Sequence, residues 1–483
     1  MLTSPLFGAD ISDYTILFGA RGESSIGFTW DIRARSAENE VDYVLNGSIN
    51  PSLGRLSPTS FGPGTLTQEE NSINGDFVMA SSSSPMNLGF GFEWREETYK
   101  IGAGDAASIE VGPTFAQFGV GSDGFQGSSL ESAGSFDSAS YALYVDVETD
   151  LTDQLSGAIA VRFEDYDEFG STVNWKISGR YAFTDNFAVR ATANTGFRAP
   201  TPGQVNTLNV TTTSDSSGNL IPNGTYPVDH PVSLTLGSKP LDPEESLSFT
   251  LGLVWSPTQR TSITLDYYDI EIDDRIALLS NTIDAATVAD LVAAGFPNAN
   301  LLQGSNANFF VNGYTSNITG IDFALTSAYE LGRGSLGVDF RHSYNQHEVS
   351  DVESGSVGVD RVYDLENQVP EHNTVLSLNY NLGNFDGLLR INRFGDWSTT
   401  GGLFGPGDAS DATDYGSVTL VGIEASYTFA DHYTVTVGGD NIFDEYPDKE
   451  KNGVLDFLGV RHAITSPFGF NGAFWYLRAS AAF

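Results

Sequence analysis

The fold is decided in residues 421–438, which read VGIEASYTFADHYTVTVG. Apolar and polar residues alternate on both sides of a three-residue link at 430–432. A period of two residues indicates a β-strand with one apolar face and one polar face. Because the link is so short, the stretch predicts an antiparallel hairpin.

The same alternation recurs along most of the chain. Several segments exceed ten residues, whereas strands of soluble proteins average about 5–6 residues. Short polar links alternate with long loops rich in Gly, Ser, Asn and Asp. This order predicts an all-β fold, a transmembrane antiparallel up-and-down β-barrel of about 17 strands, with long outer loops and short periplasmic turns. The long loops are expected near residues 46–64, 102–136, 201–242, 278–307, 350–371, 399–415 and 444–471.

Composition excludes several classes of function. The 483 residues carry 23 Lys and Arg against 62 Asp and Glu, a net charge of −39. This charge argues against nucleic acid as a partner, because such binding depends on cations that neutralise phosphates. The absence of Cys excludes disulfides and thiol catalysis. No Gly-x-Ser-x-Gly, His-Glu-x-x-His or P-loop pattern is present, so we expect no enzyme and no cofactor.

Three segments carry a family resemblance. Residues 194–201 (NTGFRAPT), 437–447 (VGGDNIFDEYP) and 474–483 (FWYLRASAAF) resemble the GFRAP, NLFD-x-x-Y and terminal aromatic segments of TonB-dependent outer-membrane receptors. Ile442 replaces Leu in the second motif. The motif positions are Gly196, Phe197, Arg198, Ala199 and Pro200; Asn441, Phe443, Asp444 and Tyr446; and Trp475, Tyr476, Leu477 and Phe483.

The resemblance implies a receptor of the Gram-negative cell outer membrane that imports a scarce ligand, energised through TonB. A ferric siderophore, haem, cobalamin, an oligosaccharide or a peptide is the implied ligand. The implied partners are membrane lipid, lipopolysaccharide, the barrel-assembly machinery and the TonB energy complex. The family barrel has 22 strands and an N-terminal plug. We therefore expect residues 1–483 to form one barrel domain, N-terminally truncated by about five strands and lacking the plug.

The motif residues also have a physical interpretation. Pro200 is expected to end a strand because it lacks an N–H, and Arg198 either pairs with lumen acids or lies solvated. Asn441 and Asp444 are expected to form turn-type hydrogen bonds. Trp475, Leu477 and Phe483 should face lipid, and Phe483 should complete an assembly signal. We interpret the first two motifs as structural, and the ligand-binding residues stay unknown.

Other segments offer weaker candidates. Residues 283–295 predict a short loop helix, whose apolar stripe we expect to pack locally under an outer loop. Acidic groups on one strand face or in a Gly-rich loop can hold a hard cation such as calcium or form a hydrated surface. Loop aromatics can stack on a ligand or pack between loops. The helix stripe is Ala285, Val288, Leu291 and Val292; the acidic groups are Asp269, Glu271 and Asp273, and Asp408, Asp411 and Asp414; the aromatics are Phe309, Phe310, Tyr314 and Phe404.

Three alternatives to an importing receptor stay open at this point. One is a passive porin-like or adhesin-like outer-membrane barrel, and another is a non-functional receptor fragment. The third is a secreted soluble β protein, whose polar strand face would meet bulk water. The length and order of the strands favour a membrane barrel over the third alternative.

We predict heat-modifiable migration of the purified protein on detergent gels. A closed or nearly closed β-sheet stays folded in detergent until it is boiled, so the unboiled sample should migrate differently from the boiled one. The measurement compares both samples on one gel. Recovery of the protein in the soluble fraction without detergent would support the soluble alternative instead.

Overall fold

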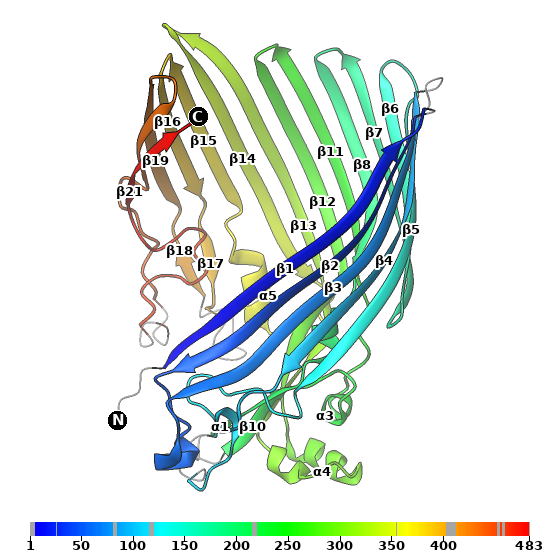
Figure 1. Cartoon of the computed structure of the whole chain (residues 1–483), viewed down its shortest axis with the longest axis vertical. Helices are drawn as coiled ribbons and strands as arrows, with labels where there is room; N and C mark the ends of the chain where they lie inside the picture. Colours follow the sequence, from blue (N-terminus) through cyan, green and yellow to red (C-terminus); the bar gives the residue numbers. More distant parts are fainter. Residues whose placement is uncertain are drawn as a thin grey trace.

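The structure is a computed structural model of the whole chain (Figure 1). It describes residues 5–25, 27–80, 85–114, 120–214, 220–353, 355–401, 412–451, 455 and 459–482. The strands are β1 (Leu6–Glu23), β2 (Phe28–Asn46), β3 (Ser60–Ala80), β4 (Met86–Gly102), β5 (Gly134–Asp150), β6 (Leu155–Tyr166), β7 (Gly170–Thr184), β8 (Phe187–Arg198), β9 (Asn209–Ser214), β10 (Leu220–Thr225), β11 (Glu244–Thr258), β12 (Thr261–Thr282), β13 (Asn306–Leu331), β14 (Gly334–Ser350), β15 (His372–Leu382), β16 (Phe385–Phe394), β17 (Trp397–Thr399), β18 (Thr413–Tyr415), β19 (Val418–Phe429), β20 (Tyr433–Asp440) and β21 (Phe474–Ala481).

One large sheet forms the wall of the molecule. Of its 19 described strands, β9 and β10 form a hairpin within a loop, and the other 17 follow one another in chain order. Each of these 17 strands pairs antiparallel with the next. The up-and-down order and the strand number predicted from sequence are confirmed. Within the described part of the chain no pairing joins β1 to β21, so the wall has two free edges.

The two ends of the wall differ, as the loop lengths predict. Tight turns join the strands at one end, and long segments join them at the other, except between β6 and β7, where the link is only residues 167–169 (Figure 1). The long segments carry short helices, several of which lie at the lower end of the view. These are η1 (Pro51–Leu56), α1 (Ala106–Ile109), α2 (Pro202–Asn206), α3 (Pro231–Thr235), α4 (Ala285–Ala293), η2 (Ala299–Leu302) and α5 (Val359–Asn367).

Alternation gives the sheet one apolar face and one polar face. On β11, Leu251 and Leu253 are 43% and 37% exposed, and they lie opposite Tyr267 and Leu265 of β12. An apolar patch that runs over many strands is far larger than a soluble monomer exposes. This face is therefore the one that meets lipid, and the opposite face lines the lumen.

The lumen face holds its charges in cross-strand pairs. Arg190 of β8 donates two hydrogen bonds to Asp266 Oδ1 (3.0 and 2.8 Å) and one to Oδ2 (2.9 Å). Gly252 of β11 lies between the two strands, and a Cβ there would collide with both side chains. The glycine thus leaves room for a bidentate pair, which is the strongest geometry for an Arg–carboxylate contact.

The loop helix predicted at 283–295 is present as α4, and its role is packing. Asp284 caps it by accepting a hydrogen bond from Thr287 N (2.8 Å), which lowers the pKa of the Asp284 carboxyl. Val288 and Leu291 are buried in a loop core with Tyr226, Val232, Ile283, Ala299, Leu302 and Ala307. Of the four stripe residues predicted to pack, Val288 and Leu291 do so, whereas Ala285 and Val292 are exposed.

Aromatic side chains cluster where the strands reach the tight turns. Phe429 stacks on Tyr433 across one turn (5.9 Å between ring centroids), and Phe183 contacts Phe187 across another (5.6 Å). Rings at this level suit the boundary between lipid and water. In the described residues, no helix has the length and apolarity that crossing a membrane requires.

A charge introduced on the apolar face should destabilise the barrel. We predict that Leu251→Arg lowers the free energy of unfolding in phospholipid vesicles by about 2–4 kcal/mol, the cost of an Arg near the bilayer midplane. Urea unfolding followed by tryptophan fluorescence measures this. The matched control is Thr250→Arg, one residue away on the polar face, which should cost less than about 1 kcal/mol. Equal losses for both variants would contradict the assignment of faces.

Candidate functional site

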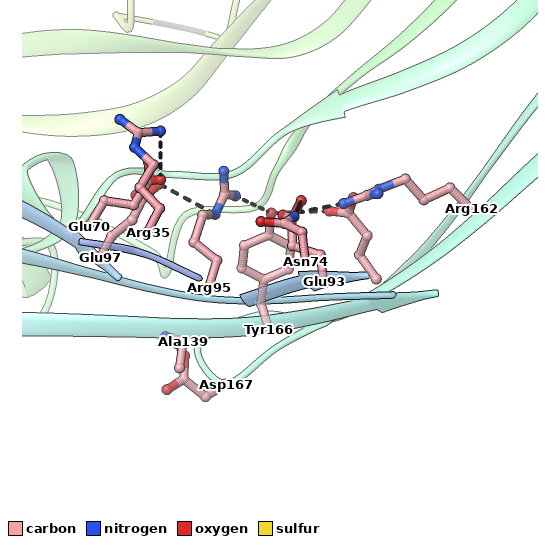
Figure 2. A network of polar contacts seen from close by, with 11 residues as sticks. Arg35, Glu70, Asn74, Glu93, Arg95, Glu97, Ala139, Arg162, Tyr166 and Asp167 are labelled. Carbon is pink, nitrogen blue, oxygen red and sulfur yellow. Dashed lines mark hydrogen bonds and ion pairs between the residues drawn. The ribbon is translucent and has the colours of Figure 1, made fainter. Parts of the chain in front are cut away.

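A network of ion pairs covers the lumen face of β2 to β6. Figure 2 shows its side chains projecting to one side of these strands, whereas Ala139 and Asp167 lie on the other side. Arg35 of β2 pairs with Glu70 of β3 (3.1 Å). Asn74 of β3 donates to Glu93 of β4 (2.8 Å). The network therefore ties neighbouring strands together through their side chains as well as their backbones.

Two further arginines, on β4 and β6, extend the network across the wall. Arg162 of β6 pairs with Glu164 and approaches Glu93 (3.5 Å). Tyr166 donates to Glu164 Oε2 (3.1 Å) and accepts from Arg95 Nη2 (3.0 Å). Arg35, Arg95 and Arg162 are partly solvated, so each of their ion pairs contributes little to stability alone. Glu164 and Tyr166 are buried. Together, these ion pairs and hydrogen bonds hold the charged side chains of the network in one arrangement.

The first family motif meets this network at the mouth of the lumen. A cavity of about 280 Å³ is lined by Arg95, Glu97 and Tyr166 on one side and by residues 197–201 on the other. Phe197 contacts the Tyr166 ring edge-on, with centroids 5.7 Å apart. The structure thus brings together a motif and a network that lie 30 or more residues apart in sequence.

Helix α2 starts where the motif ends. Thr201 and Gln204 form a capping box: Gln204 N donates to Thr201 Oγ1 (3.2 Å), and Thr201 N donates to Gln204 Oε1 (2.9 Å). A second cavity of about 390 Å³ shares Glu97 and Thr201 with the first and reaches Phe310. We call the two cavities together the mouth cavity. Its lining mixes charged, amide and aromatic groups, which suits a polar ligand with some apolar surface.

Arg198 has a partner that sequence reasoning missed. Glu244, the first residue of β11, has a side chain only 4% exposed. Its carboxylate lies 3.7 Å from Arg198 Nη1 and 3.7 Å from Arg275 Nε, and it accepts a hydrogen bond from Ile276 N (2.8 Å). The two arginines offset the cost of burying this carboxylate. Arg198 therefore anchors the return of the 199–243 segment to the wall.

The second motif closes the last long loop onto the wall. Asn441 and Asp444 both have positive φ angles, 50° and 60°. Asn441 donates to Glu445 O (2.7 Å) and accepts from Glu445 N (3.0 Å). Asp444 Oδ1 accepts from Ala473 N (2.9 Å), one residue before β21. A hydrogen bond to Asp444 raises the pKa of the Tyr446 phenol. Phe443 is exposed.

Strand β21 shows both faces of the wall. Trp475 and Leu477 lie on the apolar face and are 57% and 74% exposed. Tyr476 and Arg478 lie on the lumen face, and both donate to Glu424 Oε2 (2.6 and 2.9 Å). Phe483 lies outside the described residues.

Among the described residues, the acidic candidates do not assemble into a metal site. Asp269, Glu271 and Asp273 share the outward face of β12, and Thr315 Oγ1 donates to Asp273 (2.8 Å). In the described part of the chain no group of three or more His, Cys, Asp or Glu is placed to hold a metal ion. Asp414 is exposed, and Asp408 and Asp411 lie outside the described residues.

The loop aromatics divide between packing and the mouth cavity. Phe309 and Tyr314 are buried and serve packing. Phe310 lines the mouth cavity. Phe404 lies outside the described residues. The aromatic residue types are visible in the sequence, but only the pairing of β12 with β13 decides which side each ring faces.

A family model described as "TonB dependent receptor-like, beta-barrel" matches residues 4–442. The chain belongs to the TonB-dependent receptor family. Such receptors are transport proteins of the Gram-negative outer membrane rather than enzymes, which confirms the family and the non-enzymatic class expected from sequence. No match was found among curated proteins.

Solved structures of TonB-dependent receptors share the fold at low identity. The siderophore receptor PirA from Acinetobacter baumannii is 16% identical with a TM-score of 0.64, over 98% of this chain and 62% of that one. A ferric enterobactin receptor (PfeA) mutant from Pseudomonas aeruginosa is 14% identical with a TM-score of 0.66, over 98% of this chain and 62% of that one. The ferric yersiniabactin uptake receptor FyuA from Yersinia pestis is 13% identical with a TM-score of 0.59, over 99% of this chain and 63% of that one. The chain thus spans less than two thirds of these proteins.

We predict that Glu244→Gln loosens the 199–243 segment. Without the buried carboxylate, Arg198 and Arg275 lose their common partner, and the free energy of unfolding should fall by about 1–3 kcal/mol. Urea unfolding measures the loss, and hydrogen exchange should show faster exchange at the Ile276 amide. The matched control is Glu245→Gln, the exposed neighbour, which should change neither quantity. Equal effects of the two variants would argue against a specific role for Glu244.

Proposed function

We propose that this chain is the barrel of an outer-membrane receptor that takes up a scarce ligand, with energy supplied through TonB. A ferric siderophore is the first candidate ligand. The observation that carries the proposal is the mouth cavity, where the Gly196–Pro200 motif meets the ion-pair network of the lumen wall. Membership of the family and the fold shared with siderophore receptors support the same conclusion.

The mouth cavity has the chemistry that a chelate ligand requires. The Arg95 guanidinium presents hydrogen-bond donors, Glu97 presents an acceptor, and Phe197 and Phe310 present aromatic surface. The network holds these groups in place before a ligand arrives, so little side-chain entropy is lost on binding. Family ligands other than siderophores, such as haem, cobalamin or an oligosaccharide, would meet the same groups.

We further propose that the working receptor contains strands and a plug beyond residues 1–483. The free edges of β1 and β21 support this, because unpaired backbone N–H and C=O groups are costly in lipid. About five added strands would complete the 22-stranded barrel that the family resemblance implies. In this arrangement the lumen network of β2 to β6 would face the plug.

Uptake of radioactive ferric siderophores by cells that carry the gene tests this function. We predict uptake that depends on TonB and stops when TonB is deleted. Arg95→Ala should weaken ligand binding about tenfold, the effect of one charge-assisted hydrogen bond. The control is Arg333→Ala, an exposed arginine in a tight turn at the other end of the wall, which should leave uptake unchanged.

The outcome of this experiment separates the receptor from its alternatives. Uptake that persists without TonB would indicate a passive porin-like barrel. Absence of uptake with every ferric siderophore tested, while TonB-dependent uptake of haem, cobalamin or an oligosaccharide is present, would change the ligand but retain the receptor. Absence of all uptake would favour an adhesin-like or non-functional barrel.

A further inference from the structure

A cavity in the lumen wall lies apart from the mouth cavity. Its volume is about 600 Å³, and its described lining comes from β5, β6, β7, β8 and β11, with no residue of the mouth cavity among it. Pockets that hold small molecules measure roughly 300–1,000 Å³. The lining residues used below are Asp146, Arg162, Asn174, Lys176 and Asn194, together with Ala160. We call it the wall cavity.

The register of the sheet places two opposite charges across this cavity. Asp146 of β5 lies opposite Ala160 of β6, and Ala160 lies opposite Lys176 of β7. Residues directly opposite each other in an antiparallel pair share a face, and the chain neighbours Val145 and Ile177 are exposed on the apolar outward face. Asp146 and Lys176 therefore face the lumen with only the side chain of Ala160 between them. Because strands lie about 4.8 Å apart, about 10 Å separates their backbones.

Neither charge has an ion-pair or hydrogen-bond partner in the part of the chain that the structure describes. Asp146 is half-buried and Lys176 is exposed, and both line the cavity. A solvated charge without a partner is common on a surface, but here two opposite charges face each other across one strand and stay apart. The wall cavity therefore holds one free carboxylate and one free ammonium group.

A second pair on the same wall shows why these two charges do not meet. Arg190 of β8 and Asp266 of β12 also lie two strands apart in the sheet, and they do pair (2.8 Å). The residue between them is Gly252, where a Cβ would collide with both side chains. Ala160 holds the corresponding place in the wall cavity and has that Cβ. Its methyl group thus keeps the carboxylate and the ammonium group from closing on each other.

The other polar groups of the cavity are neutral or already paired. Arg162 pairs with Glu164 and approaches Glu93 (3.5 Å). Asn174 and Asn194 each offer an amide N–H₂ donor and a carbonyl acceptor. A simple anion would be repelled by the free carboxylate and a simple cation by the free ammonium group, and the described residues form no metal-binding group. A molecule that carries both charges is attracted by both groups.

We propose that the wall cavity binds a small zwitterion, whose ammonium group contacts Asp146 and whose carboxylate contacts Lys176. Side chains stand roughly perpendicular to a sheet, so the span between the two charges is about 10 Å. Two charge-assisted contacts of about 2.8 Å each leave room in this span for the short carbon chain of an amino acid. This binding is distinct from import through the mouth cavity.

Calorimetric titration of the whole chain in detergent tests the proposal. The probe is 4-aminobutyrate, and the controls are butyrate and n-butylamine, which retain the carbon chain but carry only one charge. We expect saturable binding of 4-aminobutyrate and about tenfold weaker binding of either analogue, the effect of losing one charge-assisted contact. This comparison uses the wild-type chain, so it does not depend on how a variant folds. It also involves no uptake, so its failure would leave the proposed function standing.

Variants at the two charges identify the site. Asp146→Asn and Lys176→Gln should each weaken binding about tenfold. The matched controls are Glu148→Gln and Arg180→Gln, which remove charges of the same sign from the same strand faces outside the cavity and should leave binding unchanged. Ala160→Gly should weaken binding, because it lets the two charges of the cavity pair with each other.

Reversing one charge separates recognition of a zwitterion from a general effect of charge. Asp146→Lys should abolish binding of 4-aminobutyrate and introduce binding of butyrate. Combined with Lys176→Asp, it leaves one charge of each sign and should restore binding of 4-aminobutyrate. The proposal is overturned if 4-aminobutyrate does not bind saturably, if butyrate or n-butylamine binds as well, or if the Glu148 and Arg180 controls weaken binding as much as the cavity variants. It is also overturned if the double variant migrates as a folded barrel on gels but does not bind.

Discussion

The structure depends on one constraint, which is that backbone N–H and C=O groups inside a bilayer must be paired within the protein. The wall meets it with 17 strands, each hydrogen-bonded to the next in chain order. Once strands are paired in this way, successive side chains must point to opposite faces. One face then carries Leu251 and its neighbours toward lipid, and the other carries charge. The net charge of −39 is compatible with a membrane protein because the apolar face carries little of it.

The same constraint explains why the mouth cavity lies at the long-loop end of the wall. Tight turns at one end leave little chain for a site, whereas the long segments at the other end build their own cores, such as the one around Leu291. Glu244 links the wall to a long loop, because it is the first residue of strand β11 and pairs with Arg198 at the start of that loop. The mouth cavity forms where such an anchored loop crosses the ion-pair network.

The sequence predicted the wall well and the sites poorly. Alternation around 421–438 identified strands, because a period of two depends only on neighbouring residues. The turn chemistry of Asn441 and Asp444 was equally local, and the hydrogen bonds to Glu445 and Ala473 fit it. Arg198 stayed ambiguous, since its partner lies 46 positions away. The helical stripe at 283–295 was half wrong, because a loop helix has no fixed neighbour to define its buried face.

By itself the sequence determined the strands, their number, the two faces and the asymmetry of turns and loops. It also carried the motifs that connect the chain to TonB-dependent receptors. Only the tertiary structure decided that Phe197 meets Tyr166 and that Glu244 is buried between two arginines. The physical reason is that periodicity follows from local backbone geometry, whereas a site is made by side chains from distant segments whose separation is set by the register of the sheet and the path of the loops.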